Sequence, residues 1–243
     1  MENSLYVGLS RQMVLQRAMD LTANNVANIS SPGYREQNPI FEEYISKPRN
    51  EKEPLSMVFD SGQYASAQSG PIQLTGGTYD VALSGSGFIG VKTPSGEIQY
   101  TRAGNFTTDS NGQLVTTSGF TVAGSGGSAI TIPAEAKEVV ITESGNVTVD
   151  GNAVGKLTID EFESINDLRP EGNGLYSALR AGRPATETIV KQGYLEGSNV
   201  NSVVEMSRMI DILRQYQSTI KMLNSEHERQ SSAIQRLAKI SGN

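Results

Sequence analysis

The chain has 243 residues and a net charge of −6, which is enough for one large domain or two small ones. The negative charge argues against binding to nucleic acid or anionic lipid, and the absence of cysteine excludes disulfides, thiolate metal sites and cysteine nucleophiles. Hydrophobic residues make up 37% and aromatic residues 6% of the chain, both low for a compact enzyme, so we expect a core of modest size.

The sequence contains no candidate for a membrane span or a secretion signal. No stretch approaches the roughly 18 consecutive apolar residues that a spanning helix needs. The opening residues, Met1-Glu-Asn-Ser4, lack the basic and apolar segments of a cleavable signal peptide. These features alone predict a cytoplasmic protein, unless export uses another route.

Glycine and proline are concentrated in the middle of the chain. Of the 25 glycines, 22 lie between Gly62 and Gly197, and all nine prolines lie between Pro32 and Pro184. Both residue types interrupt helices, so their distribution predicts helical ends and an irregular, β-rich middle.

The N-terminal segment has the spacing of an amphipathic helix. Uncharged residues recur at alternating intervals of four and three, which places them on one helical face. They are Leu5, Leu9, Gln12, Gln16, Met19, Ala23 and Val26. Asn28 can cap this helix in the left-handed conformation, and Pro32 prevents its continuation. Interior asparagine is otherwise disfavoured, so we predict that Asn24 and Asn25 make contacts between chain segments.

The middle of the chain predicts a connector followed by a β-domain. Residues 34–61 carry three prolines and several charges, which is typical of an extended connector. Residues 62–197 alternate short strand patterns with turns, and no helical pattern lies between them, so we expect an antiparallel sheet. The expected strands are Asp80–Leu83, Gly87–Val91, Ile98–Thr101, Gln113–Thr116, Ala129–Ile132, Val139–Thr142, Asn146–Val149 and Lys156–Ile159.

The C-terminal segment, from about Asn199 to Ala238, has the strongest helical pattern. A stripe free of Asp, Glu, Lys and Arg keeps a three-four spacing over its length. Its members are Val203, Met206, Ile210, Leu213, Gln217, Ile220, Asn224, His227, Ser231, Ile234 and Ala238. At 1.5 Å per residue the helix would be about 60 Å long, which a small globular body cannot cover. We therefore expect a coiled-coil-like partner, with Gln217 and Asn224 either fixing its register or lying in a half-buried stripe that awaits a neighbour.

Two features suggest a ligand site, and both lack the required context. Gly85-Ser-Gly-Phe-Ile-Gly90 matches the dinucleotide fingerprint, but it continues into the turn Thr93–Gly96 and does not open a helix. The single histidine, His227, has no second His or Cys with which to share a metal ion. We predict no cofactor, no metal site and no catalytic residue.

Several segments resemble flagellar basal-body rod and hook proteins. Ala23–Asn28 and Ser31–Arg35 resemble the N-terminal signature of that family, and Gln192–Asn201 resembles its C-terminal signature. Between them, Tyr79–Phe88 and Tyr100–Asp109 resemble the β-domain that rod and hook subunits share. The resemblance covers nearly the whole chain, with the motifs in the expected order.

This resemblance implies a structural, non-enzymatic subunit of the flagellar rod, the driveshaft that crosses the periplasm. It implies that the terminal helices pair into the inner tube of a hollow shaft, with the β-domain outside. It also implies export in unfolded form by the flagellar type III apparatus, without a cleavable signal peptide. The implied partners are other proximal and distal rod subunits, with no nucleic acid, small-molecule substrate or membrane span. Residues Met1–Gly8 and the chain length are most like a proximal-rod subunit, and the distal-rod subunit is the alternative.

The expected fold class is therefore α+β. Residues 1–33 and 198–243 would form a discontinuous, coiled-coil-like helical assembly domain, joined by the connector 34–61 to the β-domain 62–197. The predicted assembly residues lie in both helices and in the segment before the second one. They are Asn24, Asn25, Asn28, Leu195, Asn199, Val203, Met206, Ile210, Leu213, Gln217, Ile220 and Asn224.

The alternative from another class is a β-protein that binds or processes carbohydrate, for example peptidoglycan. A glycosidase needs two carboxylates about 5–9.5 Å apart. Asp150, Asp160, Glu161 and Glu163 are available, but their spacing favours no pair. The chain also has no tryptophan on which a sugar could stack.

Overall fold

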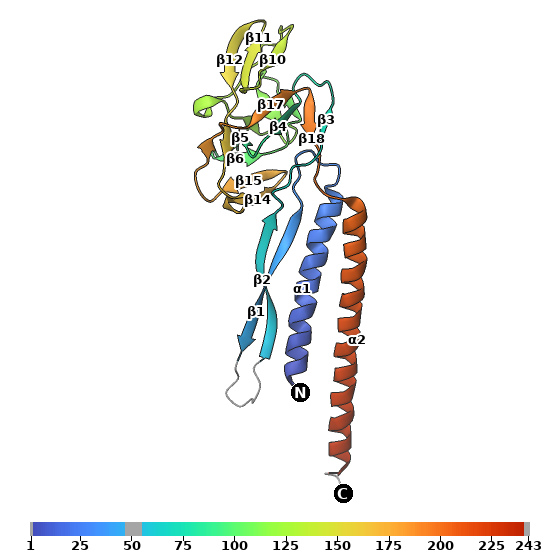
Figure 1. The fold of residues 1–243 in the computed structure, drawn as a ribbon. Coiled ribbons are helices and arrows are strands. Elements are labelled where there is room, and N and C mark those ends of the chain that lie inside the picture. The colour runs from blue at the N-terminus through green and yellow to red at the C-terminus, as the bar shows by residue number, and fades with distance from the viewer. Residues whose placement is uncertain (1, 47–54, 241–243) are drawn as a thin grey trace. The chain divides into compact units, whose positions relative to one another are not determined.

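The computed structural model describes residues 2–46 and 55–240 (Figure 1). The chain folds into two compact units, each built from segments that are distant in sequence. The helical unit combines the described parts of residues 1–27, 37–64 and 201–243, and the β-unit combines residues 28–36 and 65–200. The chain is α+β, with one helix near each end and antiparallel sheets between them, as the sequence predicts.

The helical unit is centred on two helices, α1 (Glu2–Ala27) and α2 (Ser202–Ile240). They pack against each other through Leu15 and Ala18 of α1 and Ile212 of α2. Neither helix contains, within its described residues, an apolar stretch long enough to cross a bilayer.

A β-hairpin completes the helical unit. Strands β1 (Gln37–Ser46) and β2 (Leu55–Ala65) form a two-stranded sheet that lies along α1 (Figure 1), where the sequence predicted an extended connector. Both strands of a two-stranded sheet are edge strands, which tolerate proline and charge, so Pro39 does not prevent pairing. Arg17 of α1 fastens the hairpin, because its Nε lies 3.3 Å from Asp60 Oδ2 and its Nη2 donates to Gln63 Oε1 at 2.9 Å.

The β-unit contains the remaining strands, and all of their pairings are antiparallel. They are β3 (Ile72–Leu74), β4 (Val81–Ser84), β5 (Phe88–Lys92), β6 (Ile98–Thr101), β7 (Phe106–Thr108), β8 (Leu114–Thr116), β9 (Thr121–Val122), β10 (Val139–Ile141), β11 (Asn146–Val149), β12 (Asn152–Lys156), β13 (Ile159–Glu161), β14 (Leu168–Gly172), β15 (Leu175–Ala178), β16 (Arg183–Pro184), β17 (Ile189–Gln192) and β18 (Tyr194–Glu196). Two short 3₁₀ turns, Ser125–Gly127 and Ile165–Asp167, lie between them.

These strands form one large sheet and three small ones. The order of the large sheet is β14-β15-β6-β5-β9-β8-β7, and β13 pairs with both β5 and β16. A three-stranded sheet has the order β10-β11-β12, while β17 pairs with β4 and β18 with β3. Strands β17 and β18 lie just before α2 in the sequence, so the segment that leads into α2 is tied to the β-unit.

The core of the β-unit is aliphatic. Ile89, Leu114, Val122 and Val147 are fully enclosed within one cluster. A second, aromatic cluster forms around Phe88, which meets other rings edge to face. Each such pair adds about 0.5–1.5 kcal/mol beyond area burial.

Two of the expected strands differ in the structure. Residues 129–132 make only isolated β-bridges, and residues 156–159 span the end of β12 and the start of β13. The dinucleotide-like motif leads into β5, with Gly85 at a φ of +137°, so its glycines serve a bend and a strand as expected.

Candidate assembly sites

The stripe on α2 that the sequence singles out is largely exposed in the single chain. Val203, Met206, Ile210 and Leu213 keep between 42% and 72% of their surface accessible. Further along the helix, Gln217 and Asn224 are also exposed, whereas Ile220 is half-buried. A row of large apolar side chains left in water is a surface that can gain stability from a partner.

Within the single chain, a face of α2 next to the stripe packs on α1. The buried positions are Glu205, Ile212 and Thr219. Ile212 precedes Leu213 by one residue, which is about 100° around a helix of 3.6 residues per turn. This face carries a charged residue, Glu205, whose Oε1 lies 2.8 Å from Arg208 Nη1.

Asn25 links three segments of the helical unit. Its Nδ2 donates to Gln37 O at 3.0 Å and to Glu205 Oε2 at 2.9 Å, and its Oδ1 accepts from Gln37 N at 2.9 Å. One buried amide therefore ties α1 to β1 and to α2. Asn25 makes the predicted contact between chain segments. Asn24 lies on the exposed side of α1.

The other predicted asparagines fasten loops in the β-unit. Asn28 Oδ1 accepts from Ser31 Oγ at 2.9 Å, but Asn28 does not have the left-handed conformation predicted for it; Gly33, with a φ of +67°, does. Asn199 Oδ1 accepts from Glu36 N at 2.7 Å, and its Nδ2 donates to Gln68 O at 2.8 Å. Leu195, also predicted, is half-buried in β18.

Sequence reasoning missed the most buried charged site of the β-unit, which is centred on Glu196. This residue is only 1% exposed. Its Oε1 lies 3.0 Å from Arg35 Nη2 and accepts from Gly70 N at 3.0 Å. Its Oε2 lies 2.8 Å from Arg102 Nη2 and accepts from Arg102 Nε at 2.9 Å. One carboxylate therefore faces two guanidinium groups, and we call these three residues the Glu196 cluster.

Backbone carbonyls balance the second positive charge of the Glu196 cluster. Arg102 donates to the carbonyl oxygens of Gly87, of Gly85 at 3.0 Å and of Leu83 at 3.3 Å. Arg35 likewise donates to the carbonyls of two residues in the loop between β2 and β3, Ala67 at 2.9 Å and Gln68. Both guanidinium groups are thus held by fixed dipoles as well as by the carboxylate.

Burial perturbs the titration of groups around this cluster. It lowers the pKa of Arg102, an effect that Glu196 opposes and Arg35 reinforces. Burial also raises the pKa of the neighbouring Tyr176 to about 12, although the positive charge of Arg35 acts in the opposite direction. The surroundings are therefore those of a protein interior and not of a hydrated cleft.

The three members of the Glu196 cluster come from the three signature regions of the sequence. Arg35 ends the first motif, Arg102 lies in the second and Glu196 in the third. Each motif region thus supplies one charge to a common buried centre. The presence of charged residues inside all three motif regions was the only signal in the sequence that could have pointed to it.

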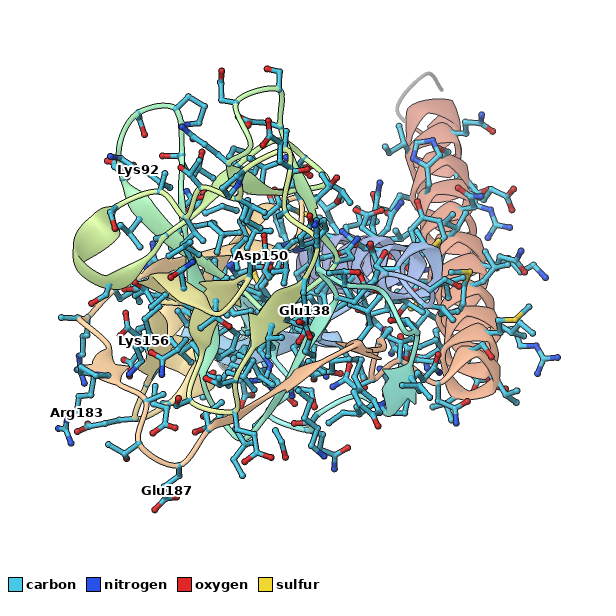
Figure 2. All side chains as sticks on the ribbon, turned by 90° about the horizontal axis from the view of Figure 1, so that it is seen from above. Lys92, Glu138, Asp150, Lys156, Arg183 and Glu187 are labelled. Atoms are coloured by element: carbon cyan, nitrogen blue, oxygen red, sulfur yellow. The ribbon has the colours of Figure 1, made fainter. Side chains whose placement is uncertain are left out.

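Two carboxylates considered for carbohydrate chemistry have structural contacts. Asp150 Oδ1 accepts from Lys137 N at 3.1 Å and from Glu138 N at 3.0 Å (Figure 2 labels Asp150 and Glu138). Glu163 forms an exposed ion pair with Arg183. Over the described residues, no group of three or more His, Cys, Asp or Glu side chains is arranged to hold a metal ion.

The remaining two carboxylates are also engaged. Asp160 accepts a hydrogen bond from Tyr100, whose pKa is raised to about 12 by burial and further by the charge of Asp160. Glu161 Oε1 accepts from Thr188 Oγ1 at 2.6 Å. Asp160 and Thr188 line a pocket of about 540 Å³, but the hydrogen bonds of both residues maintain the local fold.

Three family models match successive parts of the chain. Residues 5–35 match a flagella basal body rod protein model, and residues 82–149 match the flagellar hook protein FlgE/F/G D1 domain. Residues 191–236 match the C-terminal region of flagellar basal body rod FlgEFG proteins. Together with the fold, these matches define the class as flagellar rod and hook proteins.

Full-length relatives narrow the assignment. The chain is 37% identical to the flagellar basal-body rod protein FlgF of Caulobacter vibrioides, over 99% of this chain and 100% of the relative. It is 30% identical to FlgF of Mesorhizobium japonicum over 98% of both chains, and 32% identical to FlgG of Agrobacterium fabrum over 88% of this chain and 91% of that relative. The chain belongs to the FlgF family of flagellar basal-body rod proteins.

Proposed function

We propose that this rod protein polymerises through α1 and α2 into the hollow proximal rod, the driveshaft that transmits torque across the periplasm, and that it has no enzymatic activity. The observation that carries the proposal is the exposed stripe on α2. Four large apolar residues, Val203, Met206, Ile210 and Leu213, lie exposed at the three-four spacing of a helix-packing seam. A second helical surface would bury them.

The implied partners are further copies of this chain and other proximal and distal rod subunits. Delivery would use the flagellar type III export apparatus, with the chain unfolded. A chain free of cysteine suits this route, because it cannot form disulfides on arrival outside the cytoplasm. The distal rod is the alternative position, and the likeness to FlgG of Agrobacterium fabrum is the reason to keep it.

Family membership and geometry disfavour a peptidoglycan-processing function. A general acid and a nucleophile or base need to face one cleft at a defined separation. Here Glu161 is engaged with Thr188, Asp150 caps a turn, and Asp160 accepts from Tyr100. Each of these three carboxylates therefore has a structural hydrogen-bonding role.

Substitution of Leu213 by Asp tests the proposal. In a packed seam the change would bury an unpaired carboxylate at a cost of several kcal/mol. Leu213 is exposed in the single chain, so the variant is expected to fold normally but to be absent from basal bodies, and the cells to be non-motile. Swimming and basal-body composition are measured after complementing a strain that lacks the gene.

Ser218→Asp is the matched control, since Ser218 is an exposed residue on another face of α2. We expect this variant to be incorporated and to restore swimming. Full incorporation and normal motility of the Leu213→Asp variant would show that the stripe does not pack in the rod.

A further inference from the structure

We propose that the α2 stripe of one copy docks into an apolar groove between α1 and the β1–β2 hairpin of the next copy. The inference rests on the proposed polymerisation through the terminal helices, and it adds the surface that receives the stripe. The groove and the stripe both belong to the helical unit, so each copy would carry one of each.

The groove is an apolar hollow of about 530 Å³ along one side of α1. Met13 of α1, Tyr44 of β1 and Phe59 of β2 line it, and each keeps 60–66% of its surface exposed. The ion pair between Arg17 and Asp60 closes one wall by holding the hairpin to the helix. Three large side chains therefore surround a space that no described segment of the same chain fills.

The hairpin itself calls for a second covering layer. Ile40 and Tyr44 lie on one face of β1, and Phe41 and Ile45 lie on the other, because successive side chains alternate along a strand. All four are exposed. A two-stranded sheet is marginally stable by itself, and a strand with one solvated face normally presents polar residues there. Apolar residues on both faces indicate that the hairpin is covered on two sides in its working state.

The α2 helix of the same chain cannot be the occupant of the groove. Leu15 and Ala18 of α1 contact α2, whereas Met13 and Arg17 line the groove. Met13 and Leu15 are two residues apart, which corresponds to about 200° around the helix. The α2 helix of the same chain thus lies on the opposite side of α1 from the groove and cannot enter it.

The stripe matches the groove in length and chemistry. The groove follows α1 from Ser10 to Asp20, and the first run of exposed apolar residues on the stripe extends from Val203 to Leu213. Each spans ten residue steps, or about 15 Å at 1.5 Å per residue. Both surfaces also contain methionine, Met13 in the groove and Met206 on the stripe, whose flexible side chain fills irregular gaps.

A contact between two different patches has a direct consequence for assembly. Because the stripe and the groove lie on different faces of the helical unit, joining two copies leaves one free stripe and one free groove. Such heterologous contacts build rings or open helical filaments and do not stop at a dimer. The proposed pairing therefore explains how the filament grows as well as how two subunits bind each other.

Cysteine cross-linking tests the pairing, because the natural chain has no cysteine. The Met13→Cys/Ile210→Cys double variant is expressed in cells that lack the gene, and isolated basal bodies are treated with a short bis-maleimide. We expect covalent dimers and higher multimers of the chain. The Met13→Cys/Ser218→Cys control, with its second cysteine on another face of α2, is expected to give at least tenfold less multimer.

The outcomes separate the inference from the proposed function. Basal bodies that contain the double variant but yield no more multimer than the control would overturn the groove pairing and leave the rod function intact. Motile cells whose basal bodies lack the chain would overturn the rod function itself.

Mixing two purified variants provides a second test that does not depend on assembly in cells. Met13→Glu places a charge in the groove, and Ile210→Glu places a charge on the stripe. We therefore expect each variant alone to self-associate at least tenfold more weakly than the natural chain. A mixture retains one intact groove and one intact stripe and is expected to form one-to-one dimers in sedimentation. A mixture no tighter than either variant, or a natural chain that stays monomeric throughout, would contradict the pairing.

Discussion

Among single residues, Glu196 has the most demanding position in the chain. Its carboxylate is buried between Arg35 and Arg102, and the surplus positive charge is met by backbone carbonyls. Buried ion pairs contribute little net stability when complete, but the loss of one partner leaves a charge that nothing compensates. The Glu196 cluster therefore makes correct placement of all three signature segments a condition for a stable β-unit.

We expect Glu196→Gln to destabilise the β-unit by about 3–5 kcal/mol, because the isosteric amide leaves two buried guanidinium groups without a counter-charge. Urea unfolding of the full chain, followed by near-ultraviolet circular dichroism, measures the change. Glu163→Gln is the matched control, since Glu163 pairs with Arg183 at the surface and its loss is expected to cost about 0–1 kcal/mol. Equal stabilities of the two variants would contradict this account.

Among the secondary-structure elements, α1 contacts two neighbours on different sides. Its Leu15 and Ala18 pack on α2, while Arg17 holds the β1–β2 hairpin. Near its C-terminal end, Asn25 bonds to both β1 and α2. The asparagines at the end of α1 thus position other elements as well as ending the helix.

We expect Asn25→Ala to destabilise the helical unit by about 1–3 kcal/mol, because it leaves the buried backbone groups of Gln37 without their partner. The loss is measured as increased hydrogen exchange in α1 and β1 of the full chain. Asn224→Ala, at an exposed position of α2, is expected to change stability by no more than about 0.5 kcal/mol. Unchanged exchange near Asn25 would show that its hydrogen bonds do not hold these elements together.

The helices were predictable because the two ends of the chain are nearly free of glycine and proline and keep a regular spacing. The contact face of α2 was not, because two faces of the helix keep that spacing and the buried one carries Glu205, a residue type that is seldom buried unless paired. The β1–β2 hairpin was missed because proline and charge are tolerated in edge strands, which makes such strands resemble linkers.

The candidate site was less predictable than the fold. Arg35, Arg102 and Glu196 belong to residue types that are almost never fully buried unless paired, so composition and pattern place them at the surface. Arg102 and Glu196 are 94 residues apart in the sequence, and no local sequence pattern links them. The stripe on α2, in contrast, could be recognised from its spacing and its lack of charged residues alone.

In the molecule as a whole, both units are discontinuous, and residues 28–36 belong to the β-unit although they follow α1 directly. Gly33 N donates to Glu196 O at 2.8 Å, and Arg35 reaches the carboxylate of the same residue. The segment after α1 and the segment before α2 are therefore bonded to each other within the β-unit.

We expect limited proteolysis to cut the helices and residues 37–64 before the compact part, residues 65–200, because a two-stranded hairpin and exposed helices open more readily than layered sheets. After cleavage between residues 37 and 64, the peptide that contains Arg35 is expected to remain bound to residues 65–200. Native mass spectrometry detects the nicked complex, and denaturing conditions release the peptide as a control. Early cutting within residues 65–200, or loss of the peptide under native conditions, would contradict the assignment of residues 28–36 to this unit.

The Glu196 cluster also constrains when the β-unit can fold. Arg35 and Arg102 precede Glu196 in the chain, and the bond from Arg102 alone closes a loop across 94 residues. Loop closure on that scale is slow because the chain loses conformational entropy before the contacts that stabilise the closed loop have formed. When a chain becomes available from its N-terminus onward, Arg35 and Arg102 have no carboxylate partner until Glu196 is present. The loop between Arg102 and Glu196 therefore cannot be closed by this ion pair at an early stage. We therefore expect the Glu196 cluster to form late in folding, once the last segment of the β-unit is available.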